Sequence, residues 1–180
     1  MLLGPVSARQ AIPPGFIDFA SSSFDAILHH DASTPASTEP PPPHGLRRRS
    51  SHLPDLLPFI SLVTEKCDIQ PVHLVMALIY VQRFRATLPS NYKAEPEAAH
   101  RIFAASLLLA SKYNDDHCLS TKKLIRATGD VWSIKEMTRM ELAFLRFLKW
   151  DLHIHPDELD AFLKQFHFEH IALIFPDSTR

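Results

Sequence analysis

Proline is distributed very unevenly along this chain of 180 residues. Ten of the fifteen prolines lie at or before Pro58, and the other five are spread over the rest of the chain. Because proline lacks a backbone donor and breaks helices, the first third should be mostly irregular and the remainder can form long helices. We expect residues 1–53 to be a largely disordered Pro/Ser-rich tail, too poor in buried apolar area to offset its chain entropy.

Two stretches of this tail have a more specific pattern. Phe16 to His30 has apolar residues at helical spacing, which predicts a short helix that docks on the domain or on a partner. Three consecutive arginines, residues 47–49, precede Ser50 and Ser51. This run predicts a basic phosphorylation site at the two serines or a nuclear-import signal. The alternative is a solvated run of charges at the edge of a domain.

From Leu53 onward the apolar residues follow helical spacing, and no stretch shows sustained alternation of period two. The expected helices are Leu56 to Cys67, Pro71 to about Thr87, Pro96 to about Tyr113, Ser120 to Ala127 and Ser133 to about Leu148. Ser120 is an N-cap candidate, and Ser133 with Glu136 has the spacing of a capping box. These local signals agree with the apolar spacing, so the sequence predicts an all-α domain.

The third of these segments has the most apolar pattern. Between Ile102 and Ala110 the only polar side chain is Ser106. A helix that is apolar on nearly every side is surrounded by other helices, so this segment should lie at the centre of the domain. A further amphipathic stretch, Pro156 to about Phe168, predicts a helix that packs after the domain.

Two charged residues lie on helix faces that are otherwise apolar. At about 100° per residue, Lys112 falls between Leu108 and Ala105 on the third segment. Glu141 falls inside the edge of an apolar stripe on the fifth segment, which is formed by Met137, Met140, Phe144, Phe147 and Leu148. A buried charge is costly unless it is paired, which suggests that the two meet at a shared interface. The alternative is that Lys112 reaches solvent from its helix end and Glu141 faces water.

At these residues the sequence resembles a cyclin box. The third segment reads Arg-Ile-Phe-Ala-Ala-Ser-Leu-Leu-Leu-Ala-Ser-Lys-Tyr-Asn-Asp over residues 101–115, and the fifth ends Met-Glu-Leu-Ala-Phe-Leu-Arg-Phe-Leu-Lys-Trp-Asp-Leu over residues 140–152. The motif Tyr-Val-x-Arg-Phe-Arg at residues 80–85 is similar to the second helix of the fungal phosphate-pathway (Pcl-type) cyclins. The resemblance implies a five-helix cyclin box at residues 54–152. It would be flanked by the tail 1–53 and by a C-terminal helix and tail at 153–180.

The resemblance also implies a function and a binding site. Cyclins are non-catalytic subunits that bind and activate a cyclin-dependent protein kinase. In that family the lysine and the glutamate that match Lys112 and Glu141 sit together and hydrogen-bond the backbone of the kinase C-helix. The apolar contacts around that pair correspond to Tyr113, Leu145, Trp150 and Leu152, for which the alternative is ordinary core packing. The kinase would be bound at its C-helix and activation-loop region.

Two departures from the family pattern limit this prediction. The first helical segment lacks the Met-Arg-Ala-Ile-Leu motif with which many cell-cycle cyclins recruit substrates. Only about 28 residues follow residue 152, so we expect a single box, as in the Pcl-type class. A role in the cell cycle and a role in phosphate signalling both fit the resemblance.

The sequence gives little support for a nucleic-acid binder, a membrane protein or an enzyme. A net charge of −1 argues against a general nucleic-acid binder, and the longest apolar run is too short to cross a membrane. No Gly-rich phosphate loop, no catalytic signature and no metal-ligand spacing is present, so we expect neither an enzyme nor a cofactor or metal. The two cysteines, with no secretory pattern at the start, predict reduced thiols in the nucleus and/or the cytoplasm.

A kinase-independent cyclin-box adaptor, or a transcription-factor-like interaction module, is the remaining alternative.

Overall fold

The computed structural model describes residues 11–26, 53–92, 94–95, 97–115, 118–171 and 173. Over these ranges the secondary structure consists of seven helices and contains no strand. The helices are α1 (Pro14–Asp25), α2 (Leu56–Lys66), α3 (Pro71–Thr87), α4 (Ala98–Asn114), α5 (Thr121–Ala127), α6 (Ile134–Phe147) and α7 (Pro156–Gln165). The prediction of an all-α fold is confirmed for this part of the chain.

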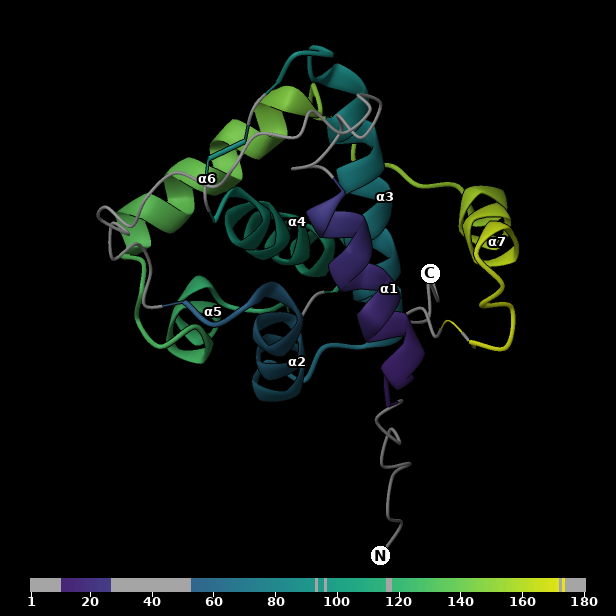
Figure 1. Cartoon of the computed structure of the whole chain (residues 1–180), viewed down its shortest axis with the longest axis horizontal. Coiled ribbons are helices and arrows are strands. Elements are labelled where there is room, and N and C mark those ends of the chain that lie inside the picture. Colours follow the sequence, from purple (N-terminus) through teal and green to yellow (C-terminus); the bar gives the residue numbers. More distant parts are fainter. Residues whose placement is uncertain are drawn as a thin grey trace, which may run out of the picture.

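Helix α4 lies at the centre of the molecule (Figure 1). It contacts α1, α2, α3, α5 and α6, and its most extensive contact is with α3. Every residue from 102 to 110 is buried, and the hydroxyl of Ser106 is satisfied because it donates to the carbonyl of Phe103 at 2.9 Å. The predicted central position of this helix is therefore confirmed.

The ends of the central helices follow from local chemistry. Pro71 begins α3, where its missing N–H is not needed, and the residues from 71 to 81 are all buried. Helix α4 begins at Ala98 and not at the predicted position 96. Glu97 has a φ of 69°, a left-handed conformation that no α-helix includes, and Pro96 lies outside the described residues. Ser120 caps α5 as predicted, since its hydroxyl accepts from the backbone N–H of Lys123 at 3.1 Å.

The two flanking helices pack on the outside of the central bundle. Phe16, Ala20 and Phe24 of α1 are fully buried, so of the two predicted alternatives the one observed is docking on the domain. The expected helix extended to residue 30, but α1 ends at Asp25, and residues 27–30 lie outside the described ranges. Helix α7 contacts α3 and ends before the predicted position 168, because His167 adopts a φ of 61°.

An aromatic cluster joins these flanking helices to each other. The ring of Phe19 lies 4.6 Å from that of Phe166 and 6.2 Å from that of Phe162, while Phe16 meets Phe168 edge-on at 4.8 Å. Aromatic pairs at such distances add to the stabilisation that comes from burial. Segments near opposite ends of the described chain therefore pack together in one apolar cluster.

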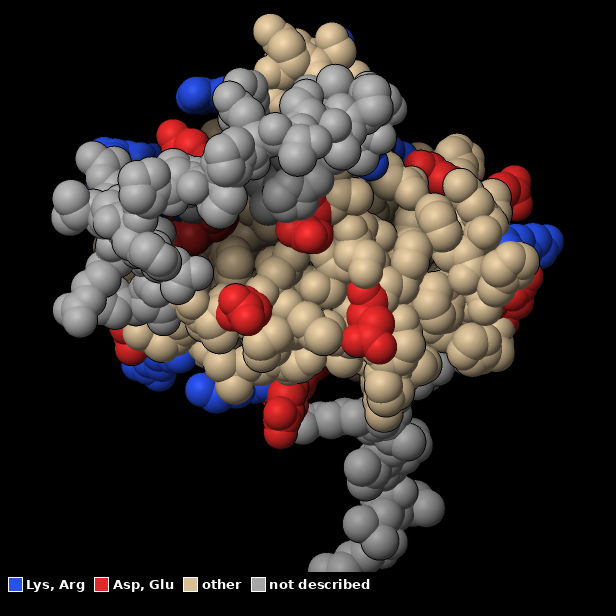
Figure 2. All heavy atoms as spheres, viewed as in Figure 1, with Lys and Arg blue, Asp and Glu red and all other residues tan. Residues whose placement is uncertain are grey.

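Charge is unevenly distributed over one face of the molecule (Figure 2). On the face that α1 crosses, acidic side chains stand among neutral ones, and the basic side chains lie mostly toward the edges of the view (Figure 2). No helix in the described part of the chain is long and apolar enough to span a membrane. Cys67 is buried and Cys118 is exposed, and both are free thiols.

Candidate partner-binding site

The two charges that sequence analysis singled out form an ion pair within the chain. Nζ of Lys112, in the last turn of α4, donates to both carboxylate oxygens of Glu141 on α6, at 2.7 and 2.9 Å. The two helices pack against each other, which brings side chains 29 residues apart into contact. The two charges are therefore paired, although Lys112 also reaches solvent from its helix end, as the alternative expected.

This ion pair lies at the surface of the molecule. The side chain of Lys112 is 38% exposed, and that of Glu141 is 13% exposed. An ion pair with this much contact with water contributes only about 0–1 kcal/mol to folding. The pair is thus a weak element of stability, but it presents an oriented ammonium and an oriented carboxylate to any molecule that covers it.

The end of α4 is held by contacts on either side of the ion pair. The hydroxyl of Ser111 accepts from the backbone N–H of Leu119 at 2.7 Å and ties the following loop to the helix. Nε2 of His73 lies 2.7 Å from Oδ2 of Asp115, while its Nδ1 accepts from the backbone of Gln70. These contacts fix the last turn of α4, so that Lys112 projects from a rigid position.

Helix α6 begins with the predicted capping box. The hydroxyl of Ser133 accepts from the backbone N–H of Glu136 at 3.2 Å, and the Glu136 carboxylate accepts from the backbone N–H of Ser133 at 2.7 Å. This backbone hydrogen bond, with a second one from the Ser133 hydroxyl, lowers the pKa of Glu136 below its usual value. Trp132 and Met137, which flank the capping box, are buried in the core. Their packing holds the start of α6 in place, and with it the position of Glu141.

The four predicted apolar contact residues occupy different positions. Tyr113 is 49% exposed and Trp150 is 63% exposed, and Leu152, two residues after Trp150, is half-buried. Leu145 is 6% exposed and belongs to the core. The hydroxyl of Tyr113 lies 3.3 Å from Nδ1 of His153, so the end of α4 meets the segment after α6.

Comparison with known proteins identifies the family. The model of the cyclin N-terminal domain matches residues 29–153, more than half of the chain. The chain belongs to the cyclin family. PHO85 cyclin-1 of Saccharomyces cerevisiae is 29% identical over 126 residues, which cover 69% of this chain and 45% of that protein. Cyclin-U4-1 of Arabidopsis thaliana is 27% identical over 119 residues, 66% of this chain and 56% of that protein.

The similarity extends to other yeast cyclins of the same group. PHO85 cyclin-9 of Saccharomyces cerevisiae is 30% identical over 109 residues, which are 60% of this chain and 36% of that protein. This cyclin thus spans less than half the length of the PHO85 cyclins that it matches. The comparison with solved structures gives no significant match. The matched range includes all six predicted contact residues.

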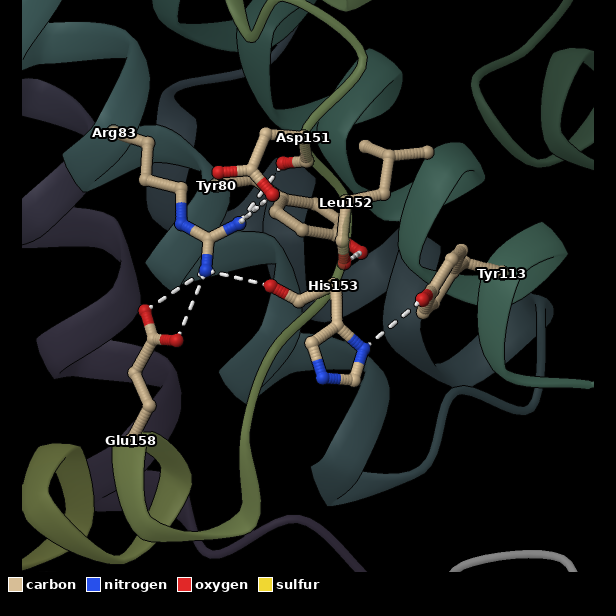
Figure 3. A network of polar contacts seen from close by, with 7 residues as sticks. All are labelled: Tyr80, Arg83, Tyr113, Asp151, Leu152, His153 and Glu158. Atoms are coloured by element: carbon tan, nitrogen blue, oxygen red, sulfur yellow. Dashed lines mark hydrogen bonds and ion pairs between the residues drawn. The ribbon is translucent and has the colours of Figure 1, made fainter.

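The residues that fix the segment after α6 in this cyclin were not predicted as functional from the sequence. Tyr80 and Arg83 of α3 donate to backbone carbonyls of residues 151–153 (Figure 3). The motif that contains them was identified only as a resemblance. Their acceptors lie 68 to 72 residues away and are main-chain atoms, which leave no trace in side-chain patterns. The signal in the sequence that could have pointed to these contacts is Arg83, an arginine just after the buried stretch of α3.

The predicted apolar stripe on α6 is only partly buried, because Met140 is half-buried and Phe147 is exposed. Phe147 is 47% exposed, although its ring packs edge-on against that of Phe84 at 5.0 Å. It is the last residue of α6. Among the described residues no three His, Cys, Asp or Glu side chains gather as a metal site.

Proposed function

We propose that this cyclin is a non-catalytic regulatory subunit that binds and activates a cyclin-dependent protein kinase. One observation carries the proposal: an ion pair between Lys112 and Glu141, with exposed Tyr113 and Trp150 nearby in the chain, on a domain of the cyclin family. Three of its relatives are named PHO85 cyclins, so a kinase of the PHO85 type is the first candidate partner.

The proposed mechanism is a shift of the kinase between two conformations. A cyclin-dependent kinase alone keeps its catalytic lysine–glutamate pair apart and its activation loop misplaced. A subunit that binds the active arrangement more tightly than the inactive one moves the kinase toward activity by its differential affinity. The Lys112–Glu141 pair would hydrogen-bond the kinase C-helix, and charge-assisted hydrogen bonds of this kind are stronger than neutral ones.

The proposed contact residues differ in their exposure in the free chain. Tyr113, Trp150 and Leu152 reach the surface, and we propose that they surround the ion pair in the complex. Leu145 is buried within the chain, so its proposed role is to support α6 from the core. In the complex the ion pair would lose its remaining water, which makes removal of either partner more costly than in the free chain.

The test is the affinity of the full chain for a purified PHO85-type kinase. Removing the carboxylate with Glu141→Ala should weaken binding by about 2 kcal/mol, since it leaves the Lys112 ammonium unpaired in the interface. Lys123→Ala is the matched control. It removes another lysine–carboxylate ion pair, in which Lys123 of α5 lies 3.0 Å from the carboxylate of Asp68. It should bind as the wild type does.

Three results would contradict the proposal. Wild-type chain that binds no cyclin-dependent kinase would favour the kinase-independent adaptor. Equal affinity of wild type and Glu141→Ala, both folded by circular dichroism, would move the interface away from α4 and α6. If Glu141→Ala and Lys123→Ala weaken kinase binding to the same extent, the effect is not specific to the Lys112–Glu141 ion pair.

We also propose that the protein acts in the nucleus and/or the cytoplasm. The support is the run of arginines at 47–49 followed by Ser50 and Ser51, which lies outside the described residues. Replacing the three arginines by alanine should lower the nuclear fraction of a fluorescent fusion of the full chain. If the nuclear fraction of the fusion is unchanged, the arginines are not an import signal, and the alternative of a solvated run of charges is favoured. Mass spectrometry of the isolated protein would show whether the two serines are phosphorylated.

A further inference from the structure

The segment that follows α6 has an irregular backbone. Lys149 and Trp150 both adopt the left-handed conformation, with φ values of 54° and 61°. The segment then continues without helix until α7 begins at Pro156. It carries Trp150 and Leu152, two of the proposed contact residues, so its conformation decides where those side chains lie.

Side chains of α3 hold this segment through its backbone. The carbonyls of three successive residues each accept a hydrogen bond: Asp151 from Arg83 at 2.9 Å, Leu152 from Tyr80 at 2.8 Å and His153 from Arg83 at 2.8 Å (Figure 3). The two donors are three residues apart on α3 and therefore lie on one face of the helix. Backbone acceptors fix the path of the chain whatever its side chains are.

Both donors suit this role chemically. The planar guanidinium of Arg83 also binds both oxygens of Glu158 on α7, at 3.0 and 2.9 Å. A lysine ammonium has no such fork and could not serve these acceptors together. Tyr80 is fully buried, and burial raises the pKa of its hydroxyl, so the group stays protonated and remains a donor.

We propose that Tyr80 and Arg83 form a latch that orders residues 150–153 for partner binding. The latch acts through the segment and is not itself a contact: His153, held by Arg83, places its ring beside the Tyr113 hydroxyl, next to Lys112. Pre-ordering of this kind raises affinity, because a partner binds only the fraction of molecules in the competent conformation. The inference rests on the proposed function and adds Arg83 to it as a positioning residue.

The first test uses the full chain without any kinase. Arg83→Lys should speed hydrogen exchange of the amides of residues 149–155 while it leaves exchange in α3 and α4 unchanged. Arg85→Lys is the matched control, because Arg85 lies on the same helix and its side chain has no polar contact with the described residues. Unchanged exchange in Arg83→Lys would overturn the latch.

The second test separates positioning from general stability. Arg83→Lys should lower the affinity for a PHO85-type kinase roughly tenfold, if the competent fraction falls to about a tenth. In a Trp150→Ala background the same change should cost much less, because the residue being positioned is absent. Full additivity of the two losses, or no loss in Arg83→Lys, would overturn the inference. A wild-type chain that does not bind the kinase would instead overturn the proposed function, and the inference with it.

Discussion

The two cysteines differ in the environment of their thiols. Cys67 is buried at the end of α2, and burial raises its pKa to about 11, while Cys118 is exposed in the loop before α5. Because the thiolate is the nucleophile, iodoacetamide at pH 8 should modify Cys118 and leave Cys67 unmodified in the folded chain. Peptide mass spectrometry measures both. Equal modification rates would contradict the described burial of Cys67.

The same shift predicts how stability depends on pH. The thiol of Cys67 has its folded pKa raised from 9.0 to about 11. Below pH 9 both the folded and the unfolded chain keep this proton, so Cys67 adds no pH dependence to the free energy of unfolding. Between pH 9 and 11 only the unfolded chain loses it, so stability should fall as the pH rises through this window. Cys67→Ala should reduce that slope in denaturant titrations, although it lowers stability at every pH.

Residue-level prediction from sequence worked where a side chain breaks a pattern. Lys112 and Glu141 stood out because charges are rare on apolar faces, and the structure pairs them. Arg83 did not stand out, because an arginine at the polar end of a helix fits the pattern. Its acceptors are backbone carbonyls placed by tertiary folding, so no spacing rule could have found them.

Helix α6 depends on its first turn, where the capping box satisfies backbone donors that the helix itself leaves free. Ser133→Ala should lower the free energy of unfolding by about 1 kcal/mol. Ser90→Ala is a suitable control, because Ser90 is exposed and makes no side-chain hydrogen bond within the described chain. Urea denaturation followed by circular dichroism compares the two. Equal midpoints would mean that tertiary packing alone fixes the start of α6.

Helix boundaries were predictable to within a few residues for a physical reason. Proline at the start of α3 and serine at the starts of α5 and α6 act through bonds inside one turn, so the local sequence contains the cause. The errors occur where the backbone adopts positive φ at residues other than glycine, at Glu97 and His167. Such conformations are uncommon for residues other than glycine, so local propensity did not predict them.

At the scale of the whole molecule, the flanking helices are part of the packed core. Phe16 of α1 is fully buried and contacts Phe168, which follows α7. Phe16→Ala should lower the free energy of unfolding by about 3–5 kcal/mol, as expected for a buried phenylalanine. Asp18→Ala, an exposed position on the same helix, is the control. If the two variants unfold at the same denaturant concentration, α1 is not part of the cooperative unit.

Activation of a kinase tests the central claim most directly. The measurement is the rate at which a purified PHO85-type cyclin-dependent kinase phosphorylates a peptide, as the full chain is titrated in. The account predicts that wild-type chain raises the rate to a plateau, and that Glu141→Ala needs roughly thirty-fold more chain for the same rate. Lys123→Ala should match the wild type. A kinase that binds the chain without any rise in rate, or a rise that Glu141→Ala reproduces at the same concentration, would contradict the account.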